Sequence, residues 1–294
     1  MNAVAHAAEL IRSGRLVAFP TETVYGLGAN ALDPAAVERI FAAKRRPKTS
    51  PLIVHVDSIA MAKRYAVAWP EAAEKLAQRY WPGPLTLVVK KTAEIPDIVT
   101  AGLPTVGLRM PDHTLALELI RTAGVPIAAP SANRFTELSP TEVDHVLPEL
   151  ADFVLDGGPS RVGIESTVLS VVDRPTLLRP GVIPLPEIEE LVGPAETAGA
   201  TQGAHPSPGM HARHYRPSTP LLLLAKGEGP PAGRGEVLKL TGGPREYAAA
   251  LYHRLHELDE QGLDWIAVEP PPDTPDWAGV LDRLRRAASE RNGR

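Results

Sequence analysis

The stretch Leu16-Val-Ala-Phe-Pro-Thr-Glu-Thr-Val-Tyr-Gly-Leu27 decides the fold, because an apolar run passes through a proline directly into polar residues. The apolar residues 16–19 predict a short buried strand that ends at Pro20. Residues 21–25 are then expected to form a turn that exposes Thr23 and its polar neighbours at the strand end. Ligands of open α/β sheets gather at such ends, so this turn is the first candidate for a site.

Alternating signals for strands and helices continue beyond this turn. Asp33 before Pro34 is typical of a helix start and predicts a helix from Pro34 to about Ala43. Further strands are expected at residues 51–56, 85–90, 106–110, 126–129, 153–155, 167–172 and 176–178. Further helices are expected at residues 4–11, 71–80, 114–122 and 141–147. Strands outnumber the crossovers between them, which favours a twisted, mixed α/β sheet with flanking helices over a regular doubly wound one.

Composition divides the chain into three parts. Residues 1–192 carry the mixed pattern of a first domain, whereas residues 193–217 lose periodicity and are rich in Gly, Ala, Pro, Ser and Thr, as in a linker. The end of this linker, residues 207–217, holds more titratable side chains than a tether needs. Residues 218–294 predict a small Rossmann-like α/β domain, with strands at 221–224, 237–240 and 265–268 and helices at 245–258 and 277–288.

The overall composition excludes several classes of protein. The 294 residues include 31 Lys and Arg against 35 Asp and Glu, so the net charge of −4 rules out a basic coat that binds nucleic acid over its whole surface. No cysteine is present, which excludes disulfides, a thiolate nucleophile and Cys-ligated metal. We find no signal peptide and no apolar run of about 20 residues that would cross a membrane. We expect a cytoplasmic protein without membrane contact.

Gly26-Leu-Gly-Ala-Asn-Ala31 matches the dinucleotide fingerprint G-x-G-x-x-A, but its context is wrong. A polar loop separates the strand from the glycines, and the helix starts late, at Asp33. The position about 20 residues on, where an acidic residue should bind a ribose, holds the basic run Lys44-Arg-Arg46 instead. We therefore interpret the glycines as part of a turn.

The basic run lies where a helix ends before Pro47. Such a run is commonly a solvated cap that complements the helix dipole. Alternatively, Lys44 and Arg46 alternate in an extended lead-in to the proline and point the same way. Two cations on one side suit a polyphosphate, with Arg as a planar fork and Lys as a point charge.

Other polar residues stand at strand ends, each with a plainer interpretation. Ser131 and Asn133 follow the strand at 126–129, although Ser/Asn turns are common. Arg109 ends an apolar strand and needs an anion, either a protein carboxylate or a ligand. His55 lies in a buried run, where a histidine is more often simply hydrogen-bonded in the core. Two histidine pairs, His211/His214 and His253/His256, have metal-like spacing but no convincing third ligand, so we expect them to face solvent and assign no metal site to the chain.

Taken in order, these motifs resemble the threonylcarbamoyl-AMP synthase family in its long form, with a YrdC-like domain, a linker and an extra C-terminal domain. The resemblance rests on the 20–27 stretch and on Lys44-x-Arg46, Ser50-Pro-Leu52, Trp81-Pro-Gly-Pro-Leu-Thr86, Ser131-x-Asn133, Gly163-Ile-Glu-Ser-Thr167, Leu178-Arg-Pro-Gly181, Ser207-Pro-Gly-Met210 and His214-Tyr215. One departure is Phe135-Thr-Glu-Leu138, which stands where the family has a glycine-containing turn before Ser139. The C-terminal domain is also shorter than the family leads us to expect.

The resemblance implies an ATP-dependent nucleotidyltransferase. It would join L-threonine, bicarbonate and ATP into L-threonylcarbamoyladenylate, with release of pyrophosphate, for the threonylcarbamoyladenosine (t6A) modification of ANN-decoding tRNA by a partner transferase complex. The residues implied for ATP are Lys44, Arg46, Ser50, Thr105, Ser131, Asn133, Ser139, Arg179 and Tyr215, with Lys44 and Arg46 also catalytic. Those implied for threonine are Thr23, His55, Arg109, Ala129 and Ser166. Mg²⁺ would be held mainly through the ATP phosphates, and the linker with Tyr215 would close over the site.

Two alternatives remain open. The basic run on a YrdC-like surface is also compatible with an RNA-binding module that lacks catalysis, although the net charge and the 5% aromatic content weigh against it. Direct tRNA contact is compatible with the enzyme but is not required by it. A related carbamoyl-adenylate activity of hydrogenase maturation lacks its accompanying acylphosphatase and zinc-finger segments here.

Overall fold

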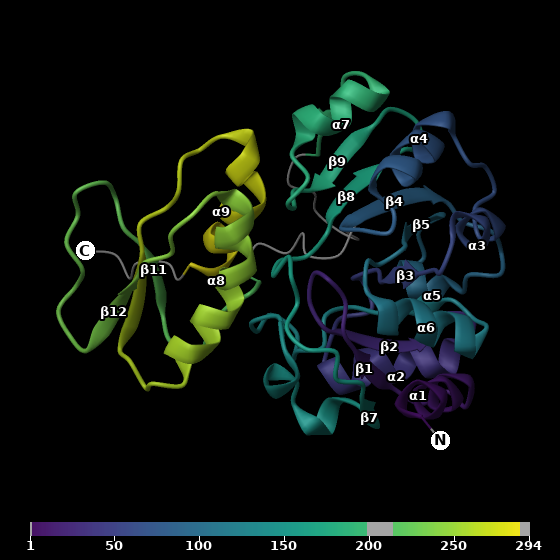
Figure 1. Ribbon diagram of the computed structural model, residues 1–294, viewed down its shortest axis with the longest axis horizontal. Helices are drawn as coiled ribbons and strands as arrows, with labels where there is room; N and C mark the ends of the chain where they lie inside the picture. Colours follow the sequence, from purple (N-terminus) through teal and green to yellow (C-terminus); the bar gives the residue numbers. More distant parts are fainter. Residues whose placement is uncertain (1, 199–213, 289–294) are drawn as a thin grey trace.

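The computed structural model describes residues 2–198 and 214–288, so the Ser207–Met210 motif, His211 and most of the expected linker lie outside the described residues. Figure 1 shows a larger body, which contains the N-terminus, beside a smaller one built from about the last quarter of the chain. Among the described residues, no helix has the length and apolar character needed to cross a membrane.

The larger body is built on one mixed sheet, as predicted. Within the described residues its order is β10-β9-β8-β4-β5-β3-β6-β2-β1-β7, with both parallel and antiparallel neighbours. The strands are β1 (Val17–Phe19), β2 (Gly26–Asn30), β3 (Ile53–His55), β4 (Leu85–Lys90), β5 (Thr105–Arg109), β6 (Ile127–Ala128), β7 (Phe153–Val154), β8 (Thr167–Ser170), β9 (Thr176–Arg179) and β10 (Glu196–Thr197). Strand β10 lies inside the stretch expected to be linker, so the sheet extends further along the chain than we predicted.

Helices flank this sheet. They are α1 (Ala3–Arg12), α2 (Pro34–Lys44), α3 (Ile59–Arg64), α4 (Glu71–Tyr80), α5 (Asp97–Thr100), α6 (Thr114–Ala123) and α7 (Leu185–Val192). Helix α2 begins as predicted, because the Asp33 side chain accepts a hydrogen bond from the Ala35 amide. The helix predicted at 141–147 is wrong. Only a 3₁₀ turn forms there, η1 (Val143–His145), followed by η2 (Pro148–Leu150), because a few residues between two prolines do not nucleate an α-helix.

The prediction that residues 21–25 form an exposed turn is also wrong. Strands β1 and β2 form an antiparallel hairpin, and Thr21, Glu22 and Thr23 between them are buried. The glycines thus belong to a strand instead of a turn. A Cβ on Gly28 would approach Phe19 and Ile127 at 2.8 Å, so glycine is needed there for close packing and not for phosphate binding.

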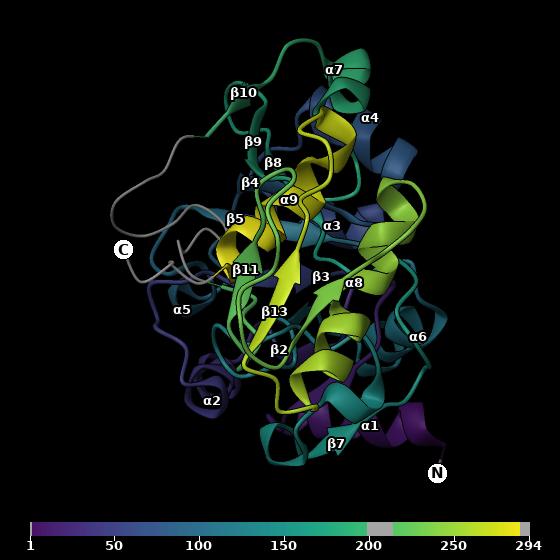
Figure 2. The same cartoon turned by 90° about the vertical axis from the view of Figure 1, so that its left-hand side faces the viewer.

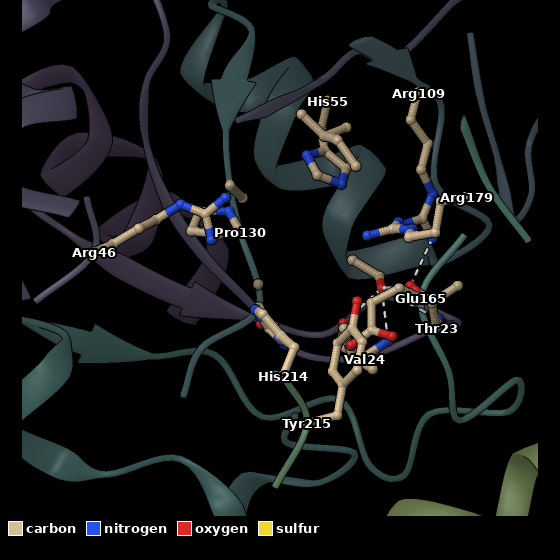
Figure 3. A pocket seen from close by; sticks show the side chains of 15 residues that line it. Thr23, Val24, Arg46, His55, Arg109, Pro130, Glu165, Arg179, His214 and Tyr215 are labelled. Carbon is tan, nitrogen blue, oxygen red and sulfur yellow. Dashed lines mark hydrogen bonds between the residues drawn. The ribbon is translucent and has the colours of Figure 1, made fainter. Parts of the chain in front are cut away.

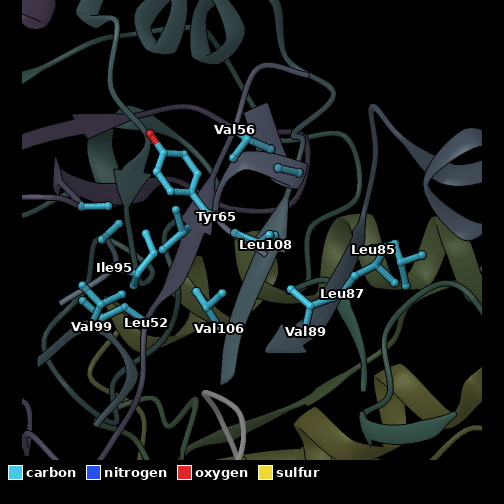
Figure 4. Packing of buried hydrophobic residues seen from close by; sticks show 14 of the residues in the cluster. Leu52, Val56, Tyr65, Leu85, Leu87, Val89, Ile95, Val99, Val106 and Leu108 are labelled. Atoms are coloured by element: carbon cyan, nitrogen blue, oxygen red, sulfur yellow. The ribbon is translucent and has the colours of Figure 1, made fainter. Parts of the chain in front are cut away.

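One side of the sheet carries the main apolar core. Figure 4 shows strand residues such as Leu87, Val89 and Leu108 packed beside helix and loop residues such as Val99 and Tyr65. These side chains are almost fully buried. A core of this kind fixes the strands, and therefore the polar residues at their ends, in one arrangement.

The smaller body is a separate α/β unit with a parallel sheet of order β11-β13-β12. Its elements are β11 (Leu221–Leu223), β12 (Gly235–Leu238), α8 (Pro244–Asp259), β13 (Trp265–Val268), η3 (Pro275–Trp277) and α9 (Ala278–Ala287). Figures 1 and 2 show α8 and α9 on the side of this sheet that faces the larger body. The two helices therefore form the seam between the domains.

Candidate functional site

A cavity collects residues from strand ends that are far apart in the sequence. Its wall includes eight of the residues that the family resemblance implies: Thr23, Arg46, His55, Arg109, Ala129, Ser131, Arg179 and, from the linker, Tyr215. Its empty space is about 530 Å³ when the open mouth is included. Figure 3 shows Arg46 on one side, with His55, Arg109 and Arg179 across the cavity from it.

Arg46 and Lys44 enter the site by a route different from the extended lead-in that we predicted. Lys44 is the last residue of α2, and Arg45 adopts a left-handed conformation with φ 52° that turns the chain. Arg45 is exposed, whereas Lys44 and Arg46 are buried. The turn, and not a strand-like alternation, is therefore what brings the two cations inside.

Both buried cations are bonded to neutral oxygens. Lys44 Nζ donates to the carbonyls of Ser131, at 2.6 Å, and of Asn133, while Arg46 Nη2 donates to the Pro51 carbonyl at 3.0 Å. Within the described chain no carboxylate lies in ion-pair distance of either cation. Burial lowers the pKa of Arg46 to about 10, and burial together with Arg46 lowers the pKa of Lys44 well below its usual value. An anionic ligand would relieve this unfavourable charge.

Arg109 finds a protein carboxylate, which was one of the two alternatives for it. Its Nη2 lies 2.8 Å from Glu22 Oε2 and donates to Thr23 Oγ1 at 2.9 Å, and its Nε donates to the Gly83 carbonyl at 3.3 Å. Among the described residues, none accepts a hydrogen bond from Nη1. Arg109 also lines the cavity, so a ligand carboxylate can still be bound by the fork.

His55 stands beside Arg109 because β3 and β5 are parallel and in register, with His55 opposite Arg109. Burial and the neighbouring Arg109 lower the pKa of His55 to about 3, so its ring is neutral at physiological pH. Nδ1 of His55 has no hydrogen-bond partner in the described part of the chain. A buried, unsatisfied ring nitrogen in the cavity wall favours a polar ligand over a purely structural role.

Arg179 and Ser166 form a second polar group beside the cavity. Arg179, the last residue of β9, donates from Nε and Nη2 to the Ser166 carbonyl and from Nη2 to the Ser166 hydroxyl, at 3.0 to 3.1 Å. The Ser166 hydroxyl is also hydrogen-bonded to Thr86 at 2.8 Å. Arg179 lines the cavity, whereas Ser166 lies behind it and orients the guanidinium.

The remaining residues implied for ATP are not all in the cavity wall. Lys44, Asn133 and Ser139 are buried but do not line it, and Ser50 is buried next to Arg46. Thr105 stands at the opposite end of β5 from Arg109, is half-buried and does not line the cavity. The structure therefore brings Thr105 into no contact with this group.

The departure from the family's glycine turn is accommodated by one strained residue. Thr136 adopts a left-handed conformation with φ 76°, which glycine would adopt without cost. The Asn133 side chain donates to the Arg134 and Glu137 carbonyls at 2.8 and 2.9 Å and so spans this turn. The chain thus reaches Ser139 without a glycine.

Glu165 is a site residue that the sequence did not reveal. It lines the cavity and accepts hydrogen bonds from Ser139 Oγ at 2.5 Å, Tyr252 OH at 3.2 Å and Arg283 Nε at 2.7 Å. Burial alone would raise the pKa of Glu165, but Arg283 and Arg179 hold it below its usual value. Arg283 comes from α9, so the C-terminal domain fixes a carboxylate of the site.

The end of the linker forms one wall of the cavity. Tyr215 is buried, has a positive φ of 63° and lies with its ring 5.1 Å from the guanidinium carbon of Arg283. Backbone hydrogen bonds from His214 to Arg286 and from Arg216 to Thr136 fasten the two neighbours of Tyr215. Figure 3 shows Tyr215 and His214 side by side at the cavity.

His253 and His256 do not simply face solvent, and that prediction is wrong. Both are half-buried at the seam, where the His256 ring stacks on His145 with centroids 3.8 Å apart. His256 Nε2 lies 3.1 Å from the Ser139 carbonyl, and His253 Nδ1 lies 2.8 Å from Glu142 Oε1. Burial, with His256 and His253 nearby, lowers the pKa of His145 to about 3. Sequence spacing within α8 did not reveal these partners, because they belong to the other domain.

The arrangement defines a class of site. A cavity at strand ends combines neutral His55 and the Arg109 fork on one side with Arg46 on the other, while Lys44 is buried outside the wall on the Ser131 carbonyl. This arrangement suits a small amino acid beside a phosphate-bearing ligand. The family model described as "Telomere recombination", for Sua5/YciO/YrdC proteins, matches residues 9–181. The model described as "Threonylcarbamoyl-AMP synthase, C-terminal domain" matches residues 183–289. The chain therefore combines a Sua5/YciO/YrdC-type domain with a threonylcarbamoyl-AMP synthase C-terminal domain.

The chain belongs to the threonylcarbamoyl-AMP synthase family. It is 42% identical to the threonylcarbamoyl-AMP synthase of Pyrococcus abyssi, over 97% of this chain and 94% of that protein. It is also 42% identical to that of Bacillus subtilis, over 98% of this chain and 93% of the relative. The crystal structure of P. abyssi Sua5 complexed with L-threonine matches with a TM-score of 0.91 at 40% identity, over 97% of this chain and 94% of that one.

Proposed function

We propose that the protein converts L-threonine, bicarbonate and ATP into L-threonylcarbamoyladenylate and pyrophosphate. The observation that carries the proposal is buried Arg46 in the wall of a cavity whose other side holds Arg109 and neutral His55. Lys44 is buried outside that wall, where it donates to the carbonyl of the wall residue Ser131. Membership in the family and the full-length likeness to relatives of this name support it.

Threonine is proposed to occupy the end formed by β3 and β5. Its carboxylate would take the Arg109 fork, which Glu22 and Thr23 hold in place. His55, being neutral, offers an acceptor to the ammonium group, and the backbone at Ala129 offers further polar atoms. Ser166 contributes by orienting Arg179, since its own side chain lies behind the cavity wall.

ATP is proposed to lie at the other end. Lys44 and Arg46 supply positive charge, and Ser131, Asn133 and Ser139 supply polar groups around it. Arg179 and the ring of Tyr215 would close the far side. Ser50 positions Arg46 through its carbonyl, and we assign Thr105 at most a contact outside the cavity described here.

The reaction proceeds in two steps that need no protein nucleophile. The threonine ammonium first loses a proton, and the resulting amine forms an N–C bond with bicarbonate. The carbon then releases hydroxide, which takes a proton from the nitrogen and leaves as water, so that an N-carboxylate remains. A carboxylate oxygen then forms a bond to the α-phosphorus, the bond from that phosphorus to the bridging oxygen breaks, and pyrophosphate leaves. Both reactants are anions, so catalysis consists mainly of alignment and of charge neutralisation by Lys44 and Arg46.

The residues present fit a Mg²⁺ ion that is held mainly by the phosphates. The carboxylates near the cavity, Glu165 and Glu22, are already paired with Arg283 and Arg109. Both oxygens of Glu22 lack a hydrogen-bond partner in the described chain, so Arg109 holds this carboxylate by charge, and we assign neither carboxylate as a dedicated metal ligand. When bound with ATP, Mg²⁺ would supply further neutralisation of phosphate charge.

The proposal also assigns a role to the end of the linker and a destination to the product. His214 and Tyr215 are well placed to cover the cavity and keep water from the reactive carbamate. We place the reaction in the cytoplasm, where the adenylate would pass to a tRNA threonylcarbamoyl transferase complex for t6A synthesis. RNA binding by the basic run itself is disfavoured, because Lys44 and Arg46 are buried and Lys48 is paired with Glu38 at 2.6 Å.

Pyrophosphate release tests the proposal. With ATP, Mg²⁺, threonine and bicarbonate present, release should require both threonine and bicarbonate, and release that ignores threonine would refute the assignment. Arg46→Ala should lower the rate by about 10²–10³-fold, as expected for removal of a group that stabilises transition-state charge. Arg39→Ala is the matched control, because Arg39 is exposed and its loss should cost less than about 1 kcal/mol. Equal effects of the two changes would mean that the basic run is only a helix cap.

A further inference from the structure

A second cluster of chemically active side chains lies at the seam between the domains, away from the substrate cavity. It joins Glu142 and His145, in and beside the 3₁₀ turn η1 of the first domain, to His253 on α8 of the second. One ligand atom from each of the three lies within 4.8 Å of the others. Glu142 Oε1 is 3.1 Å from His145 Nε2 and 2.8 Å from His253 Nδ1.

The outer side of each imidazole already has an oxygen partner. His253 Nε2 lies 3.4 Å from Glu257 Oε1, whereas His145 Nδ1 lies 3.3 Å from both the Thr141 hydroxyl and the Thr141 backbone N–H. A histidine that binds a metal through one ring nitrogen usually donates the other N–H to a carboxylate or another oxygen, which fixes its tautomer. With its proton on Nε2, His253 would turn an unprotonated Nδ1 toward Glu142, as a metal site requires. His145 Nδ1 accepts from the Thr141 N–H, so metal binding through Nε2 requires the ring proton to move to Nδ1 and to be donated to the Thr141 hydroxyl.

We propose that Glu142, His145 and His253 form a binding site for a divalent transition-metal ion, Zn²⁺ foremost, that clamps the two domains together. Two nitrogen ligands and one carboxylate are a donor set that Zn²⁺ accepts, with bonds of roughly 2.0–2.2 Å and a tetrahedral arrangement. Such bonds place neighbouring ligand atoms about 3.3 Å apart, close to the separations seen here, so small side-chain movements complete the site. The His253 side chain is 45% exposed, so solvent can supply a water as fourth ligand.

The choice of ion follows from the donors. Imidazole nitrogen favours Zn²⁺, Cu²⁺ or Ni²⁺, whereas Mg²⁺ prefers oxygen and retains its waters. This site is therefore chemically distinct from the Mg²⁺ that accompanies ATP.

A short series of contacts connects the proposed metal site to the substrate cavity. The His145 ring stacks on His256, whose Nε2 lies 3.1 Å from the Ser139 carbonyl. The Ser139 hydroxyl in turn donates to Glu165, which lines the cavity. We assign the ion a structural role, which is to hold α8 against the loop that carries Ser139.

Direct metal binding tests the proposal on the full chain after treatment with EDTA. Titration with Zn²⁺ in competition with a chromogenic chelator should show one tight equivalent per chain, and Co²⁺ should give the intense visible absorption of a tetrahedral site. Mg²⁺ in millimolar excess should not displace Zn²⁺. Zinc should also raise the thermal unfolding midpoint of the wild type. Absence of a tight equivalent, or displacement by Mg²⁺, overturns the proposal.

Variants locate the site. His253→Gln, at a half-exposed position that should not disturb folding, and Glu142→Gln should each weaken Zn²⁺ binding at least tenfold and abolish the zinc-dependent thermal shift. Glu257→Gln, which removes only the outer partner, should weaken binding by about tenfold or less. His6→Gln, on α1 of the first domain, is the matched histidine control and should bind zinc as the wild type does. Unchanged binding by His253→Gln places any zinc elsewhere and overturns the proposal.

Discussion

Replacement of Arg283 by methionine tests the link between the C-terminal domain and the substrate cavity. The Arg283 side chain is completely buried, and its Nε donates to Glu165 Oε2 at 2.7 Å. Its other nitrogens donate to the Glu165 and Pro180 carbonyls and to the Asp282 carboxylate. Methionine fills similar space but leaves Glu165 as a buried carboxylate without its main counter-charge. Breaking a buried pair in this way costs about 3–5 kcal/mol, which lowers the thermal midpoint by roughly 10 °C.

Thermal unfolding followed by circular dichroism at neutral pH measures the change. Arg285→Met is the matched control on the same helix, because Arg285 is exposed and pairs with the exposed Asp273, so its loss should cost less than about 1 kcal/mol. Adding Glu165→Gln to Arg283→Met should recover part of the loss, since the stranded charge is then gone. The pKa of Glu165 is lowered in the folded protein, so its ionised carboxylate adds to the free energy of unfolding above the ordinary carboxyl value of 4.5. This stabilisation is lost as the pH falls. A midpoint for Arg283→Met equal to that of Arg285→Met would refute the reasoning.

Three further changes probe packing, titration and the linker. Gly28→Ala, whose methyl would meet two side chains at 2.8 Å, should cost ~1–3 kcal/mol in chemical denaturation, against less than ~0.5 kcal/mol for Gly229→Ala, which has open space. Because the pKa of His55 is lowered to about 3, only the unfolded chain takes up its proton between pH 6.5 and 3. Wild-type stability should therefore fall with acid by up to ~1.4 kcal/mol per pH unit over that window, and a His55→Gln variant with the same slope would contradict this. Tyr215→Phe should have the thermal midpoint of the wild type, because no described residue forms a hydrogen bond with the hydroxyl. The same change should raise the KM for ATP in the pyrophosphate assay. An unchanged KM would mean that the hydroxyl does not contact the nucleotide.

Local sequence patterns were sufficient for much of the fold. Apolar runs located most strands, and the Asp33-Pro34 start of α2 follows from capping chemistry alone. Sequence patterns gave wrong predictions at positions whose conformation or burial depends on tertiary packing. Residues 26–30 form a strand because their glycines allow close contact with Phe19, and polar residues 21–23 are buried because Arg109 brings a charge to them. Arg109 is 86 positions from Thr23 in the sequence, so no local pattern reveals this partner.

The site was predictable only in part for the same reason. Arg109 was singled out because it ends a strand, whereas His55 was assigned only through the family resemblance. The structure places the two opposite each other because β3 and β5 run parallel. Glu165 was missed because its role depends on Arg283, 118 positions away in another domain. Motif resemblance also assigned Thr105 to ATP, a role for which the cavity offers no geometric support.

Transfer of carbon from labelled bicarbonate tests the central claim most directly, because it follows the N-carboxylate that the buried cations are proposed to align. The purified protein would be supplied with ATP, threonine, Mg²⁺ and ¹³C-bicarbonate, and the quenched mixture analysed by mass spectrometry. We predict an adenylate that contains threonine and one labelled carbon, formed in equal amount with pyrophosphate and greatly reduced in Arg46→Ala. Pyrophosphate released without a labelled adenylate, or a labelled adenylate formed equally well by Arg46→Ala, would contradict the account.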